Sequence, residues 1–130
     1  MEGKIGGDSD LTANGELYAK KLAVFANRIM KKDDYNKPCV CRLWTSTMKR
    51  TNATVKYIKK EQLMYPDPSG RSIPWINFGH KQIRNLDEIF AGECDGLTYE
   101  EIQEKFPQEF ARRQKNKLAY RYPCGESYLD

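Results

Sequence analysis

The stretch CVCRLWTSTMKRT, at residues 39–51, carries the strongest fold signal in the chain. Its first eight residues form a short run rich in strand formers, and the run does not alternate between apolar and polar residues. We therefore expect a strand buried on both faces, as in a parallel sheet. The remaining residues lead into a helix predicted to end near Gln62. A strand that passes directly into a helix indicates the α/β class.

Before this stretch, the sequence predicts a long amphipathic helix. Thr12 is a suitable N-cap, and apolar side chains then recur at helical spacing as far as about Met30. The recurring side chains are Leu17, Leu22, Phe25, Ile29 and nearby alanines. Residues 31–38 are polar and end in proline, so we expect a connection between helix and strand there.

After this stretch, the sequence predicts a long insert and two short helices. Prolines and glycines are frequent over about residues 60–82, and we expect an irregular insert there. Thr98 and Glu101 have the spacing of a capping box at a helix start. Pro107 is expected to begin a further helix that ends near Lys115.

The predicted elements are unbalanced, because one convincing strand accompanies three or four helices. Either the chain is mostly α-helical, with helices that pack on each other, or it is a piece of an α/β domain whose other strands lie elsewhere. The two ends favour the second interpretation. The chain begins in a glycine-rich loop, and Ser127 and Asp130 at its end have the spacing of a helix N-terminus.

Composition argues against several classes of protein. The net charge of +4 is a mild excess, and the basic residues are scattered among acids, unlike a nucleic-acid-binding surface. There is neither a membrane-length apolar run nor an apolar leader, so we expect a cytoplasmic protein without a membrane partner. The four cysteines lack zinc-site spacing, and we expect thiols and no metal. The single histidine, His80, is expected to be a solvated loop imidazole.

The remaining polar patterns are suited to phosphate. Lys49 and Arg50 lie at the strand-to-helix turn, where an arginine can hold phosphate oxygens in bidentate fashion. The glycines of residues 4–7 could let backbone N–H groups approach an anion. Arg113 and Lys117 are spaced to reach one side of a helix. These patterns are equally typical of a solvated cationic surface. The tyrosine hydroxyls that could bond a polar ligand are those of Tyr99, Tyr120, Tyr122 and Tyr128.

Three segments, taken in order, resemble one family. They are GKIGGDSDLTANGELYAKKLA (3–23), LWTSTMKRT (43–51) and LDEIFAGECDGLTYEEIQEKFPQEFARRQKNKLAYRYPCGESY (86–128). These segments look like the bisphosphatase domain of 6-phosphofructo-2-kinase/fructose-2,6-bisphosphatase, within the histidine phosphatase, or phosphoglycerate-mutase-like, superfamily. The resemblance implies a three-layer α/β/α domain. Residues 1–130 would be its central part, helix-rich and with few of the sheet strands.

The resemblance also implies roles for individual residues. Arg50 is similar to the arginine that holds the transferring phosphoryl group. Glu88 is similar to the residue that acts as general acid toward the C2 oxygen of fructose and then as base on the attacking water. Gly6 is similar to a backbone contact with the sugar phosphate. The residues that match contacts with the rest of the substrate, chiefly its 6-phosphate, are Tyr99, Arg113, Lys117 and Tyr128.

The implied activity is hydrolysis of fructose 2,6-bisphosphate to fructose 6-phosphate through a phosphohistidine, with no cofactor. The family's two catalytic histidines precede the glycine loop and follow the GESY motif, so the 130 residues alone are expected to be inactive. The implied partners are the phosphorylated sugar and, in the whole protein, a kinase domain or a second copy. The alternatives are a non-catalytic sugar-phosphate-binding module, a degenerate phosphatase homologue with a regulatory role, and a phosphoglycerate mutase relative.

The sequence departs from the family pattern in two places. The segment between Arg50 and Glu88 is much longer than in the family, and the extra residues would form either a lid near the site or a surface insert. Phe90 stands where the family usually has an acid.

Overall fold

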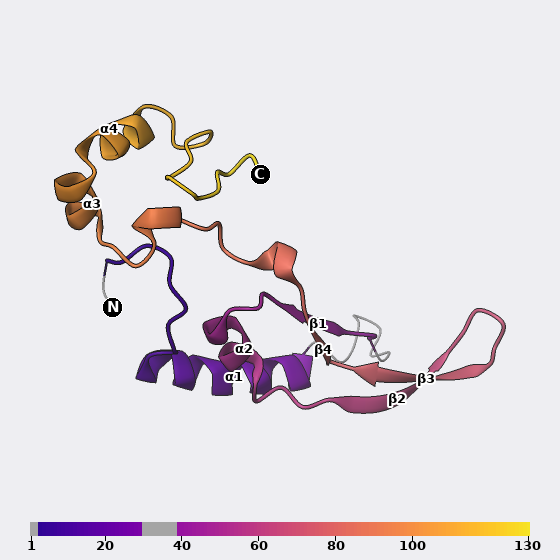
Figure 1. Cartoon of the computed structure of the whole chain (residues 1–130). Coiled ribbons are helices and arrows are strands. Elements are labelled where there is room, and N and C mark those ends of the chain that lie inside the picture. Colours follow the sequence, from indigo (N-terminus) through magenta and orange to yellow (C-terminus); the bar gives the residue numbers. More distant parts are fainter. Residues whose placement is uncertain (1–2, 30–38) are drawn as a thin grey trace. The chain divides into compact units, whose positions relative to one another are not determined.

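The computed structural model describes residues 3–29 and 39–130 (Figure 1). Two expectations, the helix end near Met30 and the connection at residues 31–38, fall outside the described residues. Among the helices that are described, none is long and apolar enough to cross a lipid bilayer.

The chain divides into two compact units, and each is described by itself. One unit consists of Met1–Ser9 with Glu88–Asp130, and the other consists of Asp10–Asp87. The elements in chain order are α1 (Ala13–Ile29), β1 (Arg42–Thr45), α2 (Lys49–Val55), β2 (Glu61–Pro66), β3 (Ser72–Asn77), β4 (Gly79–Gln82), short 3-10 turns at Arg84–Leu86 and Gly92–Cys94, α3 (Tyr99–Lys105) and α4 (Pro107–Lys115).

Helix α1 begins at the predicted cap and buries its alanines. The Thr12 hydroxyl accepts a hydrogen bond from the Gly15 N–H at 3.1 Å, which confirms the predicted N-cap. The buried side chains of α1 are Ala19, Ala23 and Ala26. Their spacing forms one stripe along the helix, and α1 contacts α2. Leu17 and Phe25 are exposed, so these two large apolar side chains of the helical pattern do not belong to the buried face.

Strand β1 pairs in parallel with β4, with Arg42 opposite Gly79. The predicted parallel pairing is therefore confirmed. The expectation that β1 is buried on both faces is wrong: Thr45 is buried, but Trp44 is 55% exposed. Successive side chains of a strand point to opposite faces, so only one face of β1 is covered at this end.

The segment expected to be irregular, about residues 60–82, instead contains strands. β2 and β3 form an antiparallel hairpin, and β4 follows directly. Helix α2 ends at Val55 rather than near Gln62, because Gln62 pairs with Ile76 in this hairpin. Figure 1 shows the hairpin as a long two-stranded ribbon.

A turn built around one aspartate joins the two strands of the hairpin. The Asp67 carboxylate accepts hydrogen bonds from the backbone N–H groups of Ser69 and Arg71, both at 2.8 Å. Gly70 adopts a left-handed backbone with φ +82°, which glycine allows without strain. A side chain that bonds the backbone a few residues on is a strong turn former, and such a turn sets the strand register.

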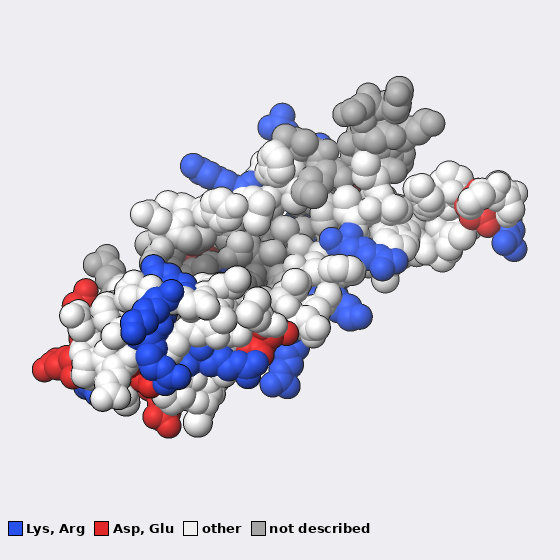
Figure 2. All heavy atoms as spheres, turned by 90° about the horizontal axis from the view of Figure 1, so that it is seen from above, with Lys and Arg blue, Asp and Glu red and all other residues white. Residues whose placement is uncertain are grey.

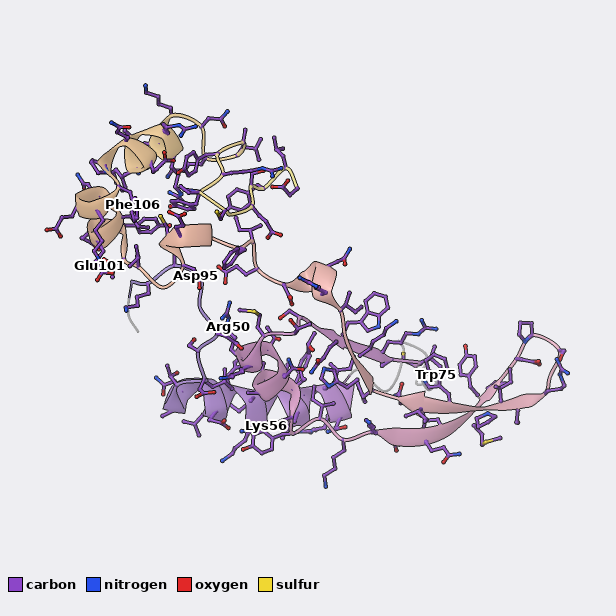
Figure 3. The ribbon with its side chains drawn as sticks, viewed as in Figure 1. Arg50, Lys56, Trp75, Asp95, Glu101 and Phe106 are labelled. Atoms are coloured by element: carbon purple, nitrogen blue, oxygen red, sulfur yellow. The ribbon has the colours of Figure 1, made fainter. Side chains whose placement is uncertain are left out.

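The unit that holds α3 and α4 has a small apolar core. Its buried members are Ala91, Cys94, Ile102 and Tyr122. Phe106, marked at the junction of α3 and α4 in Figure 3, packs against them, as does Ile5 from the N-terminal segment. The Ile5 N–H donates to the Leu97 carbonyl at 2.9 Å, and the Gly96 N–H donates to the Ile5 carbonyl at 2.8 Å. These bonds join the N-terminal segment to the loop before α3.

Helix α3 starts with the predicted capping box. The Thr98 hydroxyl accepts from the Glu101 N–H at 3.2 Å, and the Glu101 carboxylate accepts from the Thr98 N–H at 2.8 Å. We expect Thr98→Ala to destabilise the helix by about 1 kcal/mol, which makes exchange of the α3 amides about fivefold faster. Hydrogen exchange on the full-length protein measures this. Glu104→Ala, on the exposed side of the same helix, is the control; unchanged protection in Thr98→Ala would contradict the expectation.

Candidate functional site

Arg113, in α4, is held between two tyrosine rings. Its guanidinium carbon lies 5.1 Å from the centre of the Tyr99 ring and 5.9 Å from the centre of the Tyr122 ring. Both distances are within the range of cation–π attraction. A guanidinium N–H of Arg113 also donates to the Tyr99 hydroxyl at 3.2 Å. We call Tyr99, Arg113 and Tyr122 the Arg113 cluster; the start of α3, helix α4 and the segment after α4 each supply one member.

The charge of Arg113 has no carboxylate partner within residues 3–29 and 39–130. The next residue back, Arg112, is different: its guanidinium donates to the Glu109 carboxylate at 2.9 Å. A guanidinium has five N–H donors in a planar fork, and the single bond from Arg113 to the Tyr99 hydroxyl uses one of them. An arginine in this state can hold a phosphate or carboxylate group through two parallel hydrogen bonds.

Tyr122 is the buried member of the cluster, with 9% of its surface exposed. Burial raises the pKa of its hydroxyl. The positive charge of Arg113 lowers this pKa, whereas Tyr99 and Tyr128 raise it. Tyr128 is therefore close enough to act electrostatically on Tyr122, although Tyr128 itself is 63% exposed. The structure thus brings three of the expected substrate contacts, Tyr99, Arg113 and Tyr128, around Tyr122.

Lys117 does not continue helix α4. The helix ends at Lys115, and Asn116 has a non-helical backbone with φ −153°. The expectation that Arg113 and Lys117 lie on one side of a helix is wrong, because the helix stops between them. Lys117 is exposed in the turn that follows. Figure 2 shows lysine and arginine side chains gathering on the part of the molecule that holds α4 and the next segment. The basic residues there are Arg112, Arg113, Lys115, Lys117 and Arg121.

The chain end also has the predicted local capping geometry. The Ser127 N–H and hydroxyl donate to the Asp130 carboxylate at 2.6 and 2.9 Å, and the Leu129 N–H donates to the Ser127 hydroxyl at 3.2 Å. This reciprocal pattern holds Tyr128 within a tight turn.

The glycine loop at Gly6 faces a carboxylate. Gly6 has φ +62°, and a Cβ at this position would lie 1.7 Å from Asp95 Oδ1. The Gly7 N–H donates to the same Asp95 oxygen at 3.1 Å. Asp95 is labelled beside this loop in Figure 3. The positive φ of Gly6 and the missing Cβ thus allow the loop to lie close to the Asp95 carboxylate, whereas a contact between this loop and a ligand phosphate stays a prediction.

Arg50 and Glu88 belong to different units of the chain. Arg50 is half-buried in the first turn of α2, and Glu88 is exposed. Asp87, immediately before Glu88, accepts hydrogen bonds from the Thr47 N–H at 2.6 Å and from the Thr47 hydroxyl at 2.7 Å. The turn that leads into α2 is thereby fixed to the residue that precedes Glu88.

These bonds make the stability of the Thr47–Asp87 contact depend on pH. The two hydrogen bonds from Thr47 lower the pKa of Asp87. A carboxyl whose pKa is lower in the folded protein stabilises it above the unfolded-state pKa, and this contribution is lost as pH falls through the ordinary aspartate range toward the lower folded pKa. We therefore expect the free energy of unfolding of Asp87→Asn to decrease less as pH falls than that of the unsubstituted protein. Denaturant titration of the full-length protein across that pH range measures this. Equal acid sensitivity in Asp87→Asn and the unsubstituted protein would contradict this.

The histidine and cysteines make no recognisable catalytic group. His80 lies in β4 rather than in a loop, and its Nε2 is 2.7 Å from the Thr45 hydroxyl. All four cysteines are free thiols. Within the described ranges, no group of three or more His, Cys, Asp or Glu side chains is placed to hold a metal ion.

Comparison with known sequences identifies relatives along the whole chain. 6-phosphofructo-2-kinase/fructose-2,6-bisphosphatase of Arabidopsis thaliana is 44% identical over 130 residues, which are 100% of this chain and 14% of the relative. Fructose-2,6-bisphosphatase of Saccharomyces cerevisiae is 38% identical over 130 residues, which are 100% of this chain and 24% of the relative. The chain therefore spans less than a quarter of the length of either relative.

The fold is also found among solved structures. The alpha-ribazole phosphatase from Shigella flexneri superposes with a TM-score of 0.69 at 15% identity, over 98% of this chain and 53% of that chain. This likeness confirms the expected α/β fold. The sequence profile of the histidine phosphatase superfamily (branch 1) matches residues 2–130. The chain accordingly belongs to the histidine phosphatase superfamily.

Proposed function

We propose that this chain supplies the sugar-phosphate-binding part of a fructose-2,6-bisphosphatase. The whole protein would hydrolyse fructose 2,6-bisphosphate to fructose 6-phosphate and phosphate. The names of the relatives support this activity. The observation that carries the proposal is the Arg113 guanidinium, held between two tyrosine rings and without a carboxylate partner among the described residues. Such a group suits a phosphate that must be bound and released in every cycle.

In this proposal Arg113, Tyr99 and the nearby Lys117 and Tyr128 bind the 6-phosphate, which is retained in the product. Arg113 holds two phosphate oxygens with its planar fork, and the Tyr99 hydroxyl, already 3.2 Å from that fork, fixes its orientation. Lys117 and Tyr128, both exposed, supply further donors to the substrate. Gly6 contributes a backbone contact with the sugar phosphate. A permanent carboxylate partner for Arg113 would compete with the ligand, and its absence from the described residues is consistent with this role.

The reaction would proceed in two displacements at the 2-phosphate. A histidine nitrogen of the whole protein attacks phosphorus, the bond from phosphorus to the C2 oxygen breaks, and Glu88 gives its proton to that oxygen. Glu88 then takes a proton from water, whose oxygen attacks phosphorus and breaks the phosphorus–nitrogen bond. Arg50 stabilises the negative charge that develops on the transferring phosphoryl oxygens. This sequence of steps uses no metal or cofactor.

A kinase domain in the whole protein and a reducing compartment are also part of the proposal. The Arabidopsis relative carries a kinase activity in its name, so a kinase domain in the whole protein is part of the proposal. The four free thiols are consistent with a reducing compartment such as the cytoplasm.

The proposal is tested with the full-length protein and fructose 2,6-bisphosphate labelled at the 2-phosphate. We expect release of labelled phosphate, formation of fructose 6-phosphate, and a labelled phosphohistidine after rapid quenching in alkali. Tight binding of fructose 6-phosphate without turnover would instead support a non-catalytic sugar-phosphate-binding protein. Turnover of phosphoglycerates in preference to fructose 2,6-bisphosphate would support the mutase-like alternative and overturn the proposal.

A further inference from the structure

Two neighbouring tyrosines near Arg113 differ in the hydrogen bonding of their hydroxyls. The rings of Tyr120 and Tyr122 meet edge to face, with centres 5.0 Å apart and planes at 87°. The Tyr120 hydroxyl donates to the Glu109 carboxylate at 2.5 Å. The Tyr122 hydroxyl has no hydrogen-bond partner in the part of the chain that the structure describes. The pair therefore contains one satisfied and one unsatisfied hydroxyl in the same local packing.

An unsatisfied hydroxyl at this depth is unfavourable for the fold. The Tyr122 oxygen exposes less than 1 Å² to solvent, and a buried polar group without a partner loses its hydrogen bonds to water without replacement. A phenylalanine would fill the same space in the core without this penalty. The hydroxyl thus makes no hydrogen bond that stabilises the described packing. Because it lies beside Arg113, a ligand bound by Arg113 could supply the missing hydrogen-bond partner.

We propose that the Tyr122 hydroxyl donates a hydrogen bond to the phosphate group that Arg113 binds, which makes Tyr122 a further substrate-binding residue. The inference rests on the proposed function, because it assigns Tyr122 to the same phosphate. A phenolic O–H is a good donor to a phosphate oxygen, and a bond to an ionised acceptor is stronger than one between neutral groups. Burial keeps this hydroxyl protonated, since it raises the pKa of Tyr122.

The proposed bond requires the phosphate to approach the Tyr122 hydroxyl beside Arg113. The guanidinium lies over the Tyr122 ring, 5.9 Å from its centre, and it also contacts Tyr99 through the ring and through one hydrogen bond to the neutral hydroxyl. An anion that attracts the guanidinium has to overcome this neutral bond and the two cation–π contacts but no ion pair, because Arg113 has no carboxylate partner among the described residues. In this proposal the arginine head group moves toward the phosphate, and the same phosphate accepts hydrogen bonds from Arg113 and from the Tyr122 hydroxyl.

The test compares Tyr122→Phe with Tyr120→Phe in the full-length protein. Calorimetric titration with fructose 6-phosphate, and separately with inorganic phosphate, is expected to show about tenfold weaker binding of both ligands to Tyr122→Phe. Tyr120→Phe is expected to bind both ligands as the unsubstituted protein does. Hydrogen exchange over Glu88–Asp130 is expected to show the larger effect in Tyr120→Phe. This variant should lose protection because the hydrogen bond to Glu109 is gone, whereas Tyr122→Phe should keep or gain protection.

Each outcome decides the inference. Unchanged affinity of Tyr122→Phe for fructose 6-phosphate, with the unsubstituted protein binding normally, overturns the role of Tyr122 and leaves the proposed function intact. Weaker binding of fructose 6-phosphate without weaker binding of inorganic phosphate overturns the assignment to the phosphate. Failure of the unsubstituted protein to bind fructose 6-phosphate removes the proposed function, and the inference with it.

Discussion

Replacing Arg113 with alanine is expected to raise the KM of the full-length protein for fructose 2,6-bisphosphate about 100-fold, with a much smaller change in kcat. Under the proposed function, the substitution would remove two charge-assisted hydrogen bonds to the 6-phosphate, and these bonds would be present equally in the bound substrate and in the transition state. Loss of such uniform binding changes KM rather than kcat. Steady-state kinetics at several substrate concentrations separates the two constants.

Two further substitutions make this result specific to the Arg113 site. Arg112→Ala removes an adjacent positive charge, but Arg112 is paired with Glu109, so we expect its KM to change less than about threefold. Arg113→Lys keeps the charge and loses the planar fork, so its KM should lie between those of the unsubstituted protein and Arg113→Ala. A similar rise in KM for Arg112→Ala and Arg113→Ala would mean that general positive charge, and not a built site, binds the substrate.

Gly92→Ala is expected to destabilise the unit that contains α3 and α4 by about 3–5 kcal/mol, a large part of the roughly 5–15 kcal/mol that keeps a domain folded. A Cβ at Gly92 would lie 1.9 Å from the Pro123 carbonyl oxygen and 2.6 Å from the Gly125 nitrogen. Both are backbone atoms, so no side-chain rotation can relieve the overlap. The Glu93 N–H also donates to the Pro123 carbonyl at 2.9 Å, and separating the two segments breaks this bond.

Gly96→Ala is the matched control for this prediction. Gly96 has φ +78°, in the same left-handed region as Gly92 at +58°, but no atom lies within 4 Å of its hypothetical Cβ. We expect only the backbone penalty there, about 1–2 kcal/mol. Hydrogen exchange over residues 88–130 of the full-length protein reports both effects. Equal loss of protection in the two variants would show that backbone conformation, and not the contact with Pro123, decides the outcome.

Local signals in the sequence predicted several elements correctly. Thr12 and Thr98 cap their helices, Pro107 begins α4, and β1 pairs in parallel as expected. Each of these features depends on a few neighbouring residues or on the character of one strand. The capping residues satisfy backbone donors within the same turn, so their effect does not depend on the rest of the fold.

The hairpin of β2 and β3 is not predicted by the sequence, because frequent prolines and glycines are typical of irregular structure. A two-stranded ribbon tolerates Pro66 and Pro74, since each strand has an edge without a ladder partner. For α1 the predicted apolar pattern included the buried alanines but also Leu17 and Phe25, which are exposed. Helical spacing alone does not decide whether Ala23 or Phe25 is buried, and the tertiary packing buries the smaller side chain.

The Arg113 site was predicted only in part. Sequence motifs named Tyr99, Arg113 and Tyr128, but the helical pairing with Lys117 failed because α4 ends at Lys115. Tyr122 was one of four candidate hydroxyls. The structure shows that its oxygen is buried without a hydrogen-bond partner among the described residues. Hydrogen-bond satisfaction depends on residues distant in sequence, so no local pattern could have separated Tyr122 from its neighbour.

The most direct measurement is phosphorus NMR of the full-length protein acting on fructose 2,6-bisphosphate. If the Arg113 site holds the 6-phosphate while the 2-phosphate is removed, the 2-phosphate resonance should disappear as inorganic phosphate grows, and the 6-phosphate resonance should persist as fructose 6-phosphate. At substrate concentrations below KM, Arg113→Ala should give the same products about 100-fold more slowly. Loss of the 6-phosphate, or turnover by Arg113→Ala at the rate of the unsubstituted protein, would contradict the assignment of this site.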